Sequence, residues 1–170
     1  MKFAAVVFLA GLIVSLSSPS PTVAQAPRIE RLDVIQSGFL TVRRTGATMD
    51  APGSAAGVIV EADHERFLPE PPADAARVGT IFGVKFRVIG EPRNAVVNLR
   101  AIWRIPPPGI TNPKTENTYR RDLTEFPVAI GEDRIRAFGF DEPWEIVRGI
   151  WTLELWQGDR KLLEQNFVIR

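Results

Sequence analysis

The sequence contains no cysteine and only one histidine, His64, among its 170 residues. The lack of cysteine excludes disulfide bonds, a lipid-modified cysteine and thiolate metal sites. One histidine cannot supply a metal site built from several imidazole ligands, and it leaves a Ser-His-Asp triad a single candidate base. We therefore expect no metal or other cofactor, and a domain that is held together by its apolar core alone.

Long apolar runs are also missing, except at the N-terminus. Phe3 to Leu16 is almost entirely apolar, follows the single charge of Lys2, and gives way to serines and prolines. This run is shorter than the roughly 20 apolar residues that cross a bilayer. A positive start, a short apolar run and small residues are instead typical of a signal peptide.

The predicted signal peptide has two possible ends. Cleavage after Ala26 would leave Pro27 first, which fits a peptidase site poorly, so we expect cleavage after Ala24. The sequence thus predicts a signal peptide over 1–24 and a single domain over 25–170, periplasmic or secreted, with no membrane span after cleavage.

An excess of charge is absent as well. The whole chain has 21 basic and 20 acidic residues, and Lys2 lies in the predicted signal peptide, which leaves 20 of each sign. A nearly neutral domain is not expected to bind nucleic acid or an anionic membrane through its net charge. Oligomeric state does not follow from the sequence.

What the sequence does contain is apolar residues that recur with a period of two between glycines and prolines, the pattern of β-strands. No helical pattern of apolar residues is evident. The segments expected to be strands are 29–42, 58–67, 82–88, 96–105, 119–130, 134–140, 150–156 and 162–169. We expect loops over 45–57 and 68–78, a hairpin-length connection over 90–94, and a closing hairpin through Gln157 to Arg160. About seven or eight short strands predict an antiparallel sandwich or barrel.

Several short motifs occur in a fixed order along this chain. They are 78–83 (VGTIFG), 106–113 (PPPGITNP), 140–145 (FDEPWE), 149–152 (GIWT) and 164–167 (EQNF). The ordered set resembles a bacterial family of small exported proteins catalogued only as a domain of unknown function. The closing hairpin is also similar to the last strands of many immunoglobulin-like domains. The resemblance implies an immunoglobulin-like antiparallel β-sandwich in the periplasm or outside the cell, and no activity, ligand or catalytic residue.

Four basic residues alternate with core residues on two strands and are the candidate binding site. Lys85 and Arg87 face outward on one strand, and Arg100 and Arg104 face outward on the next. If these strands pair, the four side chains share one face, with the pair 120–121 (RR) expected nearby. Arginine binds carboxylate and phosphate groups in a bidentate manner. The alternative is that these cations pair with Glu154 or Glu164 across neighbouring strands.

Two sets of carboxylates are the candidates for acid–base chemistry. Glu61, Asp63 and Glu65 alternate along one strand, and Asp141 and Glu145 lie near each other in a loop. Paired carboxylates are sufficient for glycoside hydrolysis. The alternative for the first set is a solvated strand face, because calcium loops use a turn with backbone carbonyls.

Two aromatic or rigid features are further candidates for recognition. Trp103 alternates with core residues, whereas Trp151 and Trp156 have opposite parity on one strand, so one of them is expected to face outward. An outward tryptophan suits sugar or peptide binding, and packing against the loop around Trp144 is the alternative. The rigid segment 106–113 is either a recognition loop or a crossover between the two sheets.

Taken together, the sequence favours a non-catalytic binding or assembly module of the cell envelope, with a protein or glycan partner. The alternative is an envelope glycan- or peptide-acting enzyme that uses paired carboxylates, such as Glu61 and Glu65 or Asp141 and Glu145. A pocket that brings two carboxylates together would favour the enzyme. We also expect Phe86 and three other residues, Leu99, Trp103 and Phe167, to form the core.

Overall fold

A computed structural model describes residues 26–55 and 57–170, except that the side chains of residues 44, 45, 49 and 58–64 are not described. The predicted signal peptide therefore lies outside the described residues. In the described part, no helix is long and apolar enough to cross a membrane.

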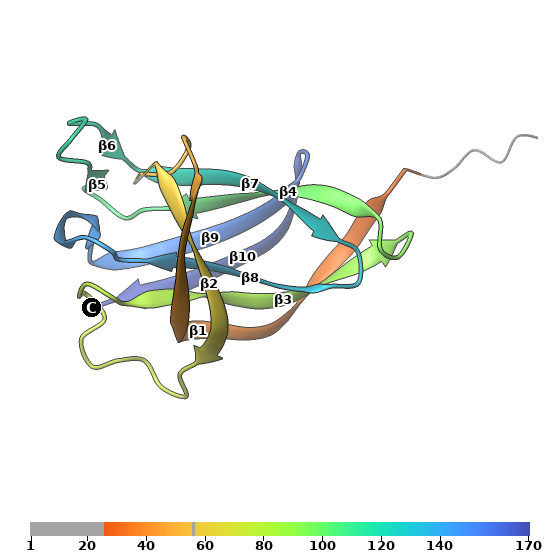
Figure 1. The fold of residues 1–170 in the computed structure, drawn as a ribbon, viewed down its shortest axis with the longest axis horizontal. Coiled ribbons are helices and arrows are strands. Elements are labelled where there is room, and N and C mark those ends of the chain that lie inside the picture. The colour runs from red at the N-terminus through yellow and green to blue at the C-terminus, as the bar shows by residue number, and fades with distance from the viewer. Residues whose placement is uncertain (1–25, 56) are drawn as a thin grey trace, which may run out of the picture.

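The described residues form ten strands and one short 3₁₀ helix (Figure 1). The strands are β1 (Arg28–Asp50), β2 (Val58–Phe67), β3 (Ile81–Glu91), β4 (Val96–Arg104), β5 (Ile110–Thr111), β6 (Thr118–Tyr119), β7 (Arg121–Ala129), β8 (Asp133–Gly139), β9 (Gly149–Gln157) and β10 (Arg160–Ile169), and the helix is η1 (Pro143–Glu145). Sheet A has the order β2-β1-β3-β8, and sheet B has the order β10-β9-β4-β7. All their pairings are antiparallel.

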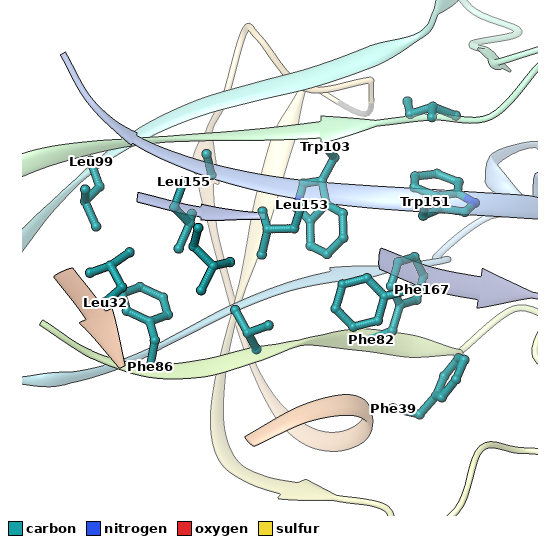
Figure 2. Packing of buried hydrophobic residues seen from close by; sticks show 14 of the residues in the cluster. Leu32, Phe39, Phe82, Phe86, Leu99, Trp103, Trp151, Leu153, Leu155 and Phe167 are labelled. Atoms are coloured by element: carbon teal, nitrogen blue, oxygen red, sulfur yellow. The ribbon is translucent and has the colours of Figure 1, made fainter. Parts of the chain in front are cut away.

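The two sheets pack over one core because most of their strands turn an apolar side inward (Figure 2). On β3, Phe82, Val84 and Phe86 are fully buried while Arg87 is exposed. The four residues predicted to form the core are all buried; these are Phe86, Leu99, Trp103 and Phe167. The predicted core is therefore confirmed.

Aromatic rings fill one half of this core around Phe82. Its ring lies 5.3 Å from that of Phe167, 5.4 Å from Trp103 and 5.6 Å from Trp151, measured between centroids. The indole N–H of Trp151 donates to the carbonyl of Val147 at 2.8 Å, so this polar group is satisfied inside the core. Rings from both sheets thus interlock.

The strand order is that of an immunoglobulin-like sandwich, as predicted. Strands β1, β3 and β8 take the places of strands A, B and E, and β4, β9 and β10 take those of C, F and G. Strand β7 is added beside β4 at the edge of sheet B. The hairpin of β9 and β10 closes the sheet, also as predicted.

Two predicted connections differ from the structure. Residues 90–94 do not form a hairpin, because β3 and β4 belong to different sheets and this segment crosses between them. Conversely, 106–113 is not a crossover between sheets. It leads from β4 through the small β5–β6 pair to β7, which returns to the same sheet beside β4.

The predicted loop over 45–57 is shorter than expected, because β1 continues to Asp50 and pairs with β2 along this extension. The far end of the β1–β2 hairpin leaves sheet A and reaches β7 at the edge of sheet B (Figure 1). There the amide of Leu123 donates to the carbonyl of Gly53 at 3.0 Å. The turn of the hairpin therefore covers part of the exposed edge of β7, which also carries Pro127 where a strand would need an amide donor.

Candidate anion-binding groove

The four predicted binding residues do not form one patch. Lys85 and Arg87 lie on β3 in sheet A, whereas Arg100 and Arg104 lie on β4 in sheet B. Because the apolar sides of both strands face the shared core, their polar sides point in opposite directions. The prediction of a shared face is wrong for this reason.

In the half of the predicted patch on sheet A, Arg87 is already paired, whereas Lys85 has no ion pair among the described residues. Arg87 donates from Nε at 2.6 Å and from Nη2 at 2.9 Å to the two carboxylate oxygens of Asp133, its direct neighbour across β3 and β8. This hydrogen bonding lowers the pKa of the Asp133 carboxyl. Arg87 is thus paired across strands, as in the alternative, but with Asp133 and not with Glu154 or Glu164. The Nε and Nη2 donors of Arg87 are therefore not free for a ligand.

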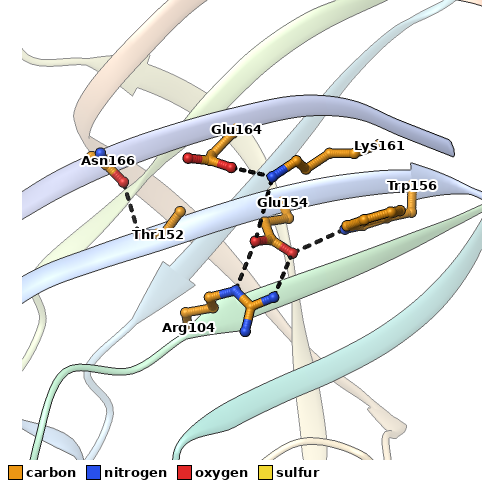
Figure 3. Close-up of polar contacts among 7 residues, drawn as sticks. All are labelled: Arg104, Thr152, Glu154, Trp156, Lys161, Glu164 and Asn166. Atoms are coloured by element: carbon orange, nitrogen blue, oxygen red, sulfur yellow. Dashed lines mark hydrogen bonds and ion pairs between the residues drawn. The ribbon is translucent and has the colours of Figure 1, made fainter. Parts of the chain in front are cut away.

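On sheet B, Arg104 is also bound to a carboxylate (Figure 3). It donates from Nε at 2.7 Å and from Nη2 at 3.2 Å to Glu154. Glu154 accepts a further hydrogen bond from the indole of Trp156 at 3.0 Å and has Lys161 at 3.9 Å. These groups cover Glu154 so well that it is 4% exposed on an outward-facing position. The hydrogen bond from Arg104 is the main reason that the pKa of Glu154 is lowered.

The tryptophans follow the predicted parity, because Trp151 is buried in the core and Trp156 faces outward. Arg100 and Lys161 lie over the ring of Trp156, at 6.0 and 5.7 Å from its centroid. Arg100 also donates to the carbonyl of Gly158 at 3.0 Å. Trp156 is therefore occupied by cation–π contacts on sheet B and does not pack against the Trp144 loop as the alternative supposed.

A groove of about 610 Å³ opens beside Arg104 at the start of β7. Its lining combines three arginines with the hairpin turn and the β5–β6 arm; these residues are Pro52, Gly53, Arg104, Thr118, Tyr119, Arg120, Arg121 and Leu123. No acidic side chain is among its described lining residues. A second hollow, lined by Arg28 and Arg160, also contains Glu30 and Glu91, whereas three arginines line this groove, which is therefore the candidate site.

The pairing of strands forces these cations together. Arg104 and Arg121 are direct neighbours across β4 and β7, an arrangement in which like charges repel. Glu154 lies beside Arg104 on β9, on the side away from β7. Among the described residues, neither Arg120 nor Arg121 has an ion pair with a carboxylate. The groove therefore carries positive charge that no carboxylate among the described residues pairs with.

One wall of the groove is the hairpin turn, and buried polar contacts fix it. The amide of Ala55 donates to Oδ2 of Asp122 at 2.9 Å, and its carbonyl accepts from Nδ2 of Asn112 at 2.9 Å. Asp122 and Asn112 are both buried. Burial raises the pKa of the Asp122 carboxyl, and the hydrogen bond from Ala55 opposes this shift.

Sequence reasoning found only part of this groove. It singled out Arg104 and placed the 120–121 pair near it, but Asp122, Asn112 and the turn at Pro52 were missed. In the sequence, the feature that pointed to the groove was the pair of consecutive arginines, Arg120 and Arg121. The contribution of the turn depends on a hairpin that crosses to the other sheet, and no local pattern encodes that contact.

The carboxylate candidates give no catalytic arrangement in the described residues. Glu145 is buried, and its Oε2 accepts backbone amides from Asp141 at 2.6 Å and from Glu142 at 2.9 Å. It forms the capping box of η1, so its carboxylate has a structural role. The side chains of Glu61, Asp63 and His64 lie outside the described part. Within the described part, no three His, Asp or Glu side chains gather as metal ligands do.

Two of the solved structures to which this chain is similar are as follows. One is an immunoglobulin-like protein of Pseudomonas aeruginosa, at 20% identity and a TM-score of 0.46, over 82% of this chain and 97% of that one. The other is a β-D-glucoside glucohydrolase of Trichoderma reesei, at 12% identity and a TM-score of 0.34, over 82% of this chain and 19% of the enzyme. The chain thus spans less than a fifth of that enzyme's length.

No protein-family model matches the sequence, and no curated protein matches it. The resemblance to a family of small exported proteins therefore stays a prediction. The fold follows from the strand order, and neither structural neighbour bears on what the groove binds.

Proposed function

We propose that this protein is a non-catalytic binding module of the bacterial cell envelope that recognises anionic groups on its partner through the arginine groove. The observation that carries the proposal is the pair Arg120 and Arg121, which line a groove of about 610 Å³ and have no carboxylate partner among the described residues. Guanidinium groups match carboxylate and phosphate groups geometrically. A volume of this size is typical of ligand sites.

The site is also built to persist without a ligand. Glu154 fixes the guanidinium of Arg104, and the contacts of Ala55 with Asp122 and Asn112 fix the facing wall. A preformed site loses less conformational entropy when it binds. The role in the envelope is supported by the signal-peptide pattern at the N-terminus.

Ion-exchange retention of matched variants tests the anion site. The double variant Arg120→Ala/Arg121→Ala and the control Lys85→Ala/Arg87→Ala lose the same charge, one from the groove and the other from the outer face of sheet A. On a carboxymethyl matrix at low salt, we expect the groove variant to elute earlier than the control, because Arg87 is already paired. Equal elution of the two variants would refute an anion site in the groove.

Export is tested separately. We expect the full chain, produced in a bacterium, to appear outside the cytoplasm with Gln25 at its N-terminus, since cleavage is predicted after Ala24. Fractionation followed by mass measurement of the N-terminal peptide gives the answer. An N-terminus at Pro27 would support the alternative cleavage site, and an intact chain in the cytoplasm would refute export.

A further inference from the structure

We infer that the groove takes an extended acidic segment of a partner protein, with carboxylate side chains at alternate positions. This inference rests on the proposed function, since it names the chemistry of the anion that the groove binds.

The charge of the groove calls for more than one negative group. Three arginines line it, and among the described residues Glu154 pairs only with Arg104. Arg120 and Arg121 remain uncompensated by any described carboxylate. Arg121 lies opposite Arg104 across β4 and β7, whereas Arg120 lies in the segment between β6 and β7. Two separate anions satisfy them better than a single compact one.

The shape of the groove favours a chain over a free ion. Its volume of about 610 Å³ is far larger than an inorganic anion fills, and the rest of its lining includes Pro52, Tyr119 and Leu123. These surfaces suit the aliphatic stems and backbone of a peptide. In an extended segment, side chains two residues apart lie on one face and about 6.5–7 Å from each other. That spacing allows one carboxylate for each free arginine.

The choice of carboxylate follows from the site itself. Arg104 already holds the carboxylate of Glu154 with two donors, Nε and Nη2, at the border of the groove. Its side chain is still 59% exposed, so the opposite edge of the guanidinium is open. A carboxylate of the partner could bind that open edge, so that Arg104 would lie between two carboxylates, that of Glu154 and that of the partner.

Binding of labelled peptides to the full protein tests the inference. The probe is a fluorescein-labelled ten-residue peptide of glycine and serine with a central Glu-Ala-Glu, and its controls carry Gln-Ala-Gln or Glu-Glu-Ala. We expect fluorescence anisotropy to show binding of the first peptide about tenfold tighter than of the Gln-Ala-Gln peptide, and an affinity that falls with added salt. The Glu-Glu-Ala peptide has the same charge and is expected to bind more weakly, because consecutive side chains point to opposite faces.

Variants of the protein locate the binding. We expect Arg120→Gln and Arg121→Gln each to weaken the Glu-Ala-Glu peptide several-fold, while Lys85→Ala/Arg87→Ala leaves it unchanged. Both groove residues are exposed, so their glutamine variants are expected to fold, which circular dichroism checks.

The outcomes separate the two proposals. Equal affinity for the Glu-Ala-Glu and Glu-Glu-Ala peptides would overturn the alternate spacing. If a single-phosphoserine peptide or inorganic phosphate binds in an Arg121-dependent manner and the glutamate peptides do not, the acidic-segment inference fails while the anion groove stands. If none of these probes binds, both fail.

Discussion

The two outer faces of this sandwich carry similar residues but differ in how their charges are balanced. On sheet A, Arg87 is matched by Asp133 across the strands, and Arg31 is matched by Asp33 at 2.8 Å on the same strand. On sheet B, the cations near the start of β7 outnumber the carboxylates, and Arg121 stands directly opposite Arg104. The number of outward arginines on a face therefore does not identify a binding site. Arginines that line a groove and have no carboxylate partner do.

The largest expected effect comes from a change in the core that lies between the two sheets. Phe82→Ala deletes a fully buried ring that contacts rings from both sheets, so we expect the free energy of unfolding to fall by about 3–5 kcal/mol. Urea denaturation followed by tryptophan fluorescence measures this loss. Val168→Ala, at an exposed position of β10, serves as the control and should change the stability little. A small loss for Phe82→Ala would mean that the sheets do not share this core.

The next prediction concerns Glu154, the carboxylate that pairs with Arg104 on sheet B. Glu154→Gln keeps the shape but loses the charge that Arg104, Trp156 and Lys161 contact, so we expect a loss of about 1–3 kcal/mol at neutral pH. Because the pKa of Glu154 is lowered in the folded state, its ionised form stabilises the fold above its ordinary pKa of 4.5. That contribution disappears as the pH falls through the lowered pKa.

The difference in stability between the native protein and Glu154→Gln should therefore shrink in acid. Chemical denaturation at a series of pH values measures it, with Glu164→Gln on the neighbouring strand as the control, because Glu164 is exposed. A constant difference at all pH values would show that the loss in Glu154→Gln is not electrostatic.

Asp122, which holds the hairpin turn at the wall of the groove, predicts the opposite dependence of stability on pH. Burial raises the pKa of Asp122, so the folded state holds its proton more tightly than the unfolded chain does. Its ionisation therefore costs stability as the pH rises through the raised pKa. Asp122→Asn keeps an acceptor for the amide of Ala55, and we expect its stability at neutral pH to change by no more than about 1 kcal/mol.

The informative result for Asp122→Asn is the slope of stability with pH. We expect this variant to lose the fall in stability that the native protein shows above the ordinary range of an aspartate. Asp122→Ala, which removes the acceptor, should cost more and should also weaken binding in the groove, because the turn at Gly53 is released. Identical slopes for the native protein and Asp122→Asn would contradict the burial of a charged carboxylate there.

The sequence predicts the strands better than it predicts their partners. Period-two alternation placed 58–67 and the closing hairpin, and it identified Phe86 and Trp103 as core, because these features depend on local pattern. The same alternation cannot tell whether two strands lie side by side or face to face, since both arrangements bury the same apolar side. For that reason 90–94 was expected to be a hairpin.

The candidate site shows the same limit more sharply. Arg104 was found from its outward position, and Glu154 was one of the two glutamates named as its alternative partner. The arginine that crowds Arg104, Arg121, lies across β4 and β7, and this pairing was not predicted. The turn at Pro52 reaches the groove only because β1 and β2 are long enough to leave their own sheet. Each of these contacts is a consequence of strand order and strand length, which one sequence does not specify.

The smallest expected effect is on sheet A, and it sharpens the comparison most directly. Arg87→Ala removes the arginine of the exposed Arg87–Asp133 ion pair on sheet A. Exposed ion pairs contribute little to stability because water screens them. We expect no measurable change in unfolding by urea and none in the affinity for the Glu-Ala-Glu peptide, whereas Arg121→Ala leaves stability intact and weakens the peptide. If Arg87→Ala weakened the peptide as much as Arg121→Ala does, compensation by a carboxylate would not be what distinguishes the two faces.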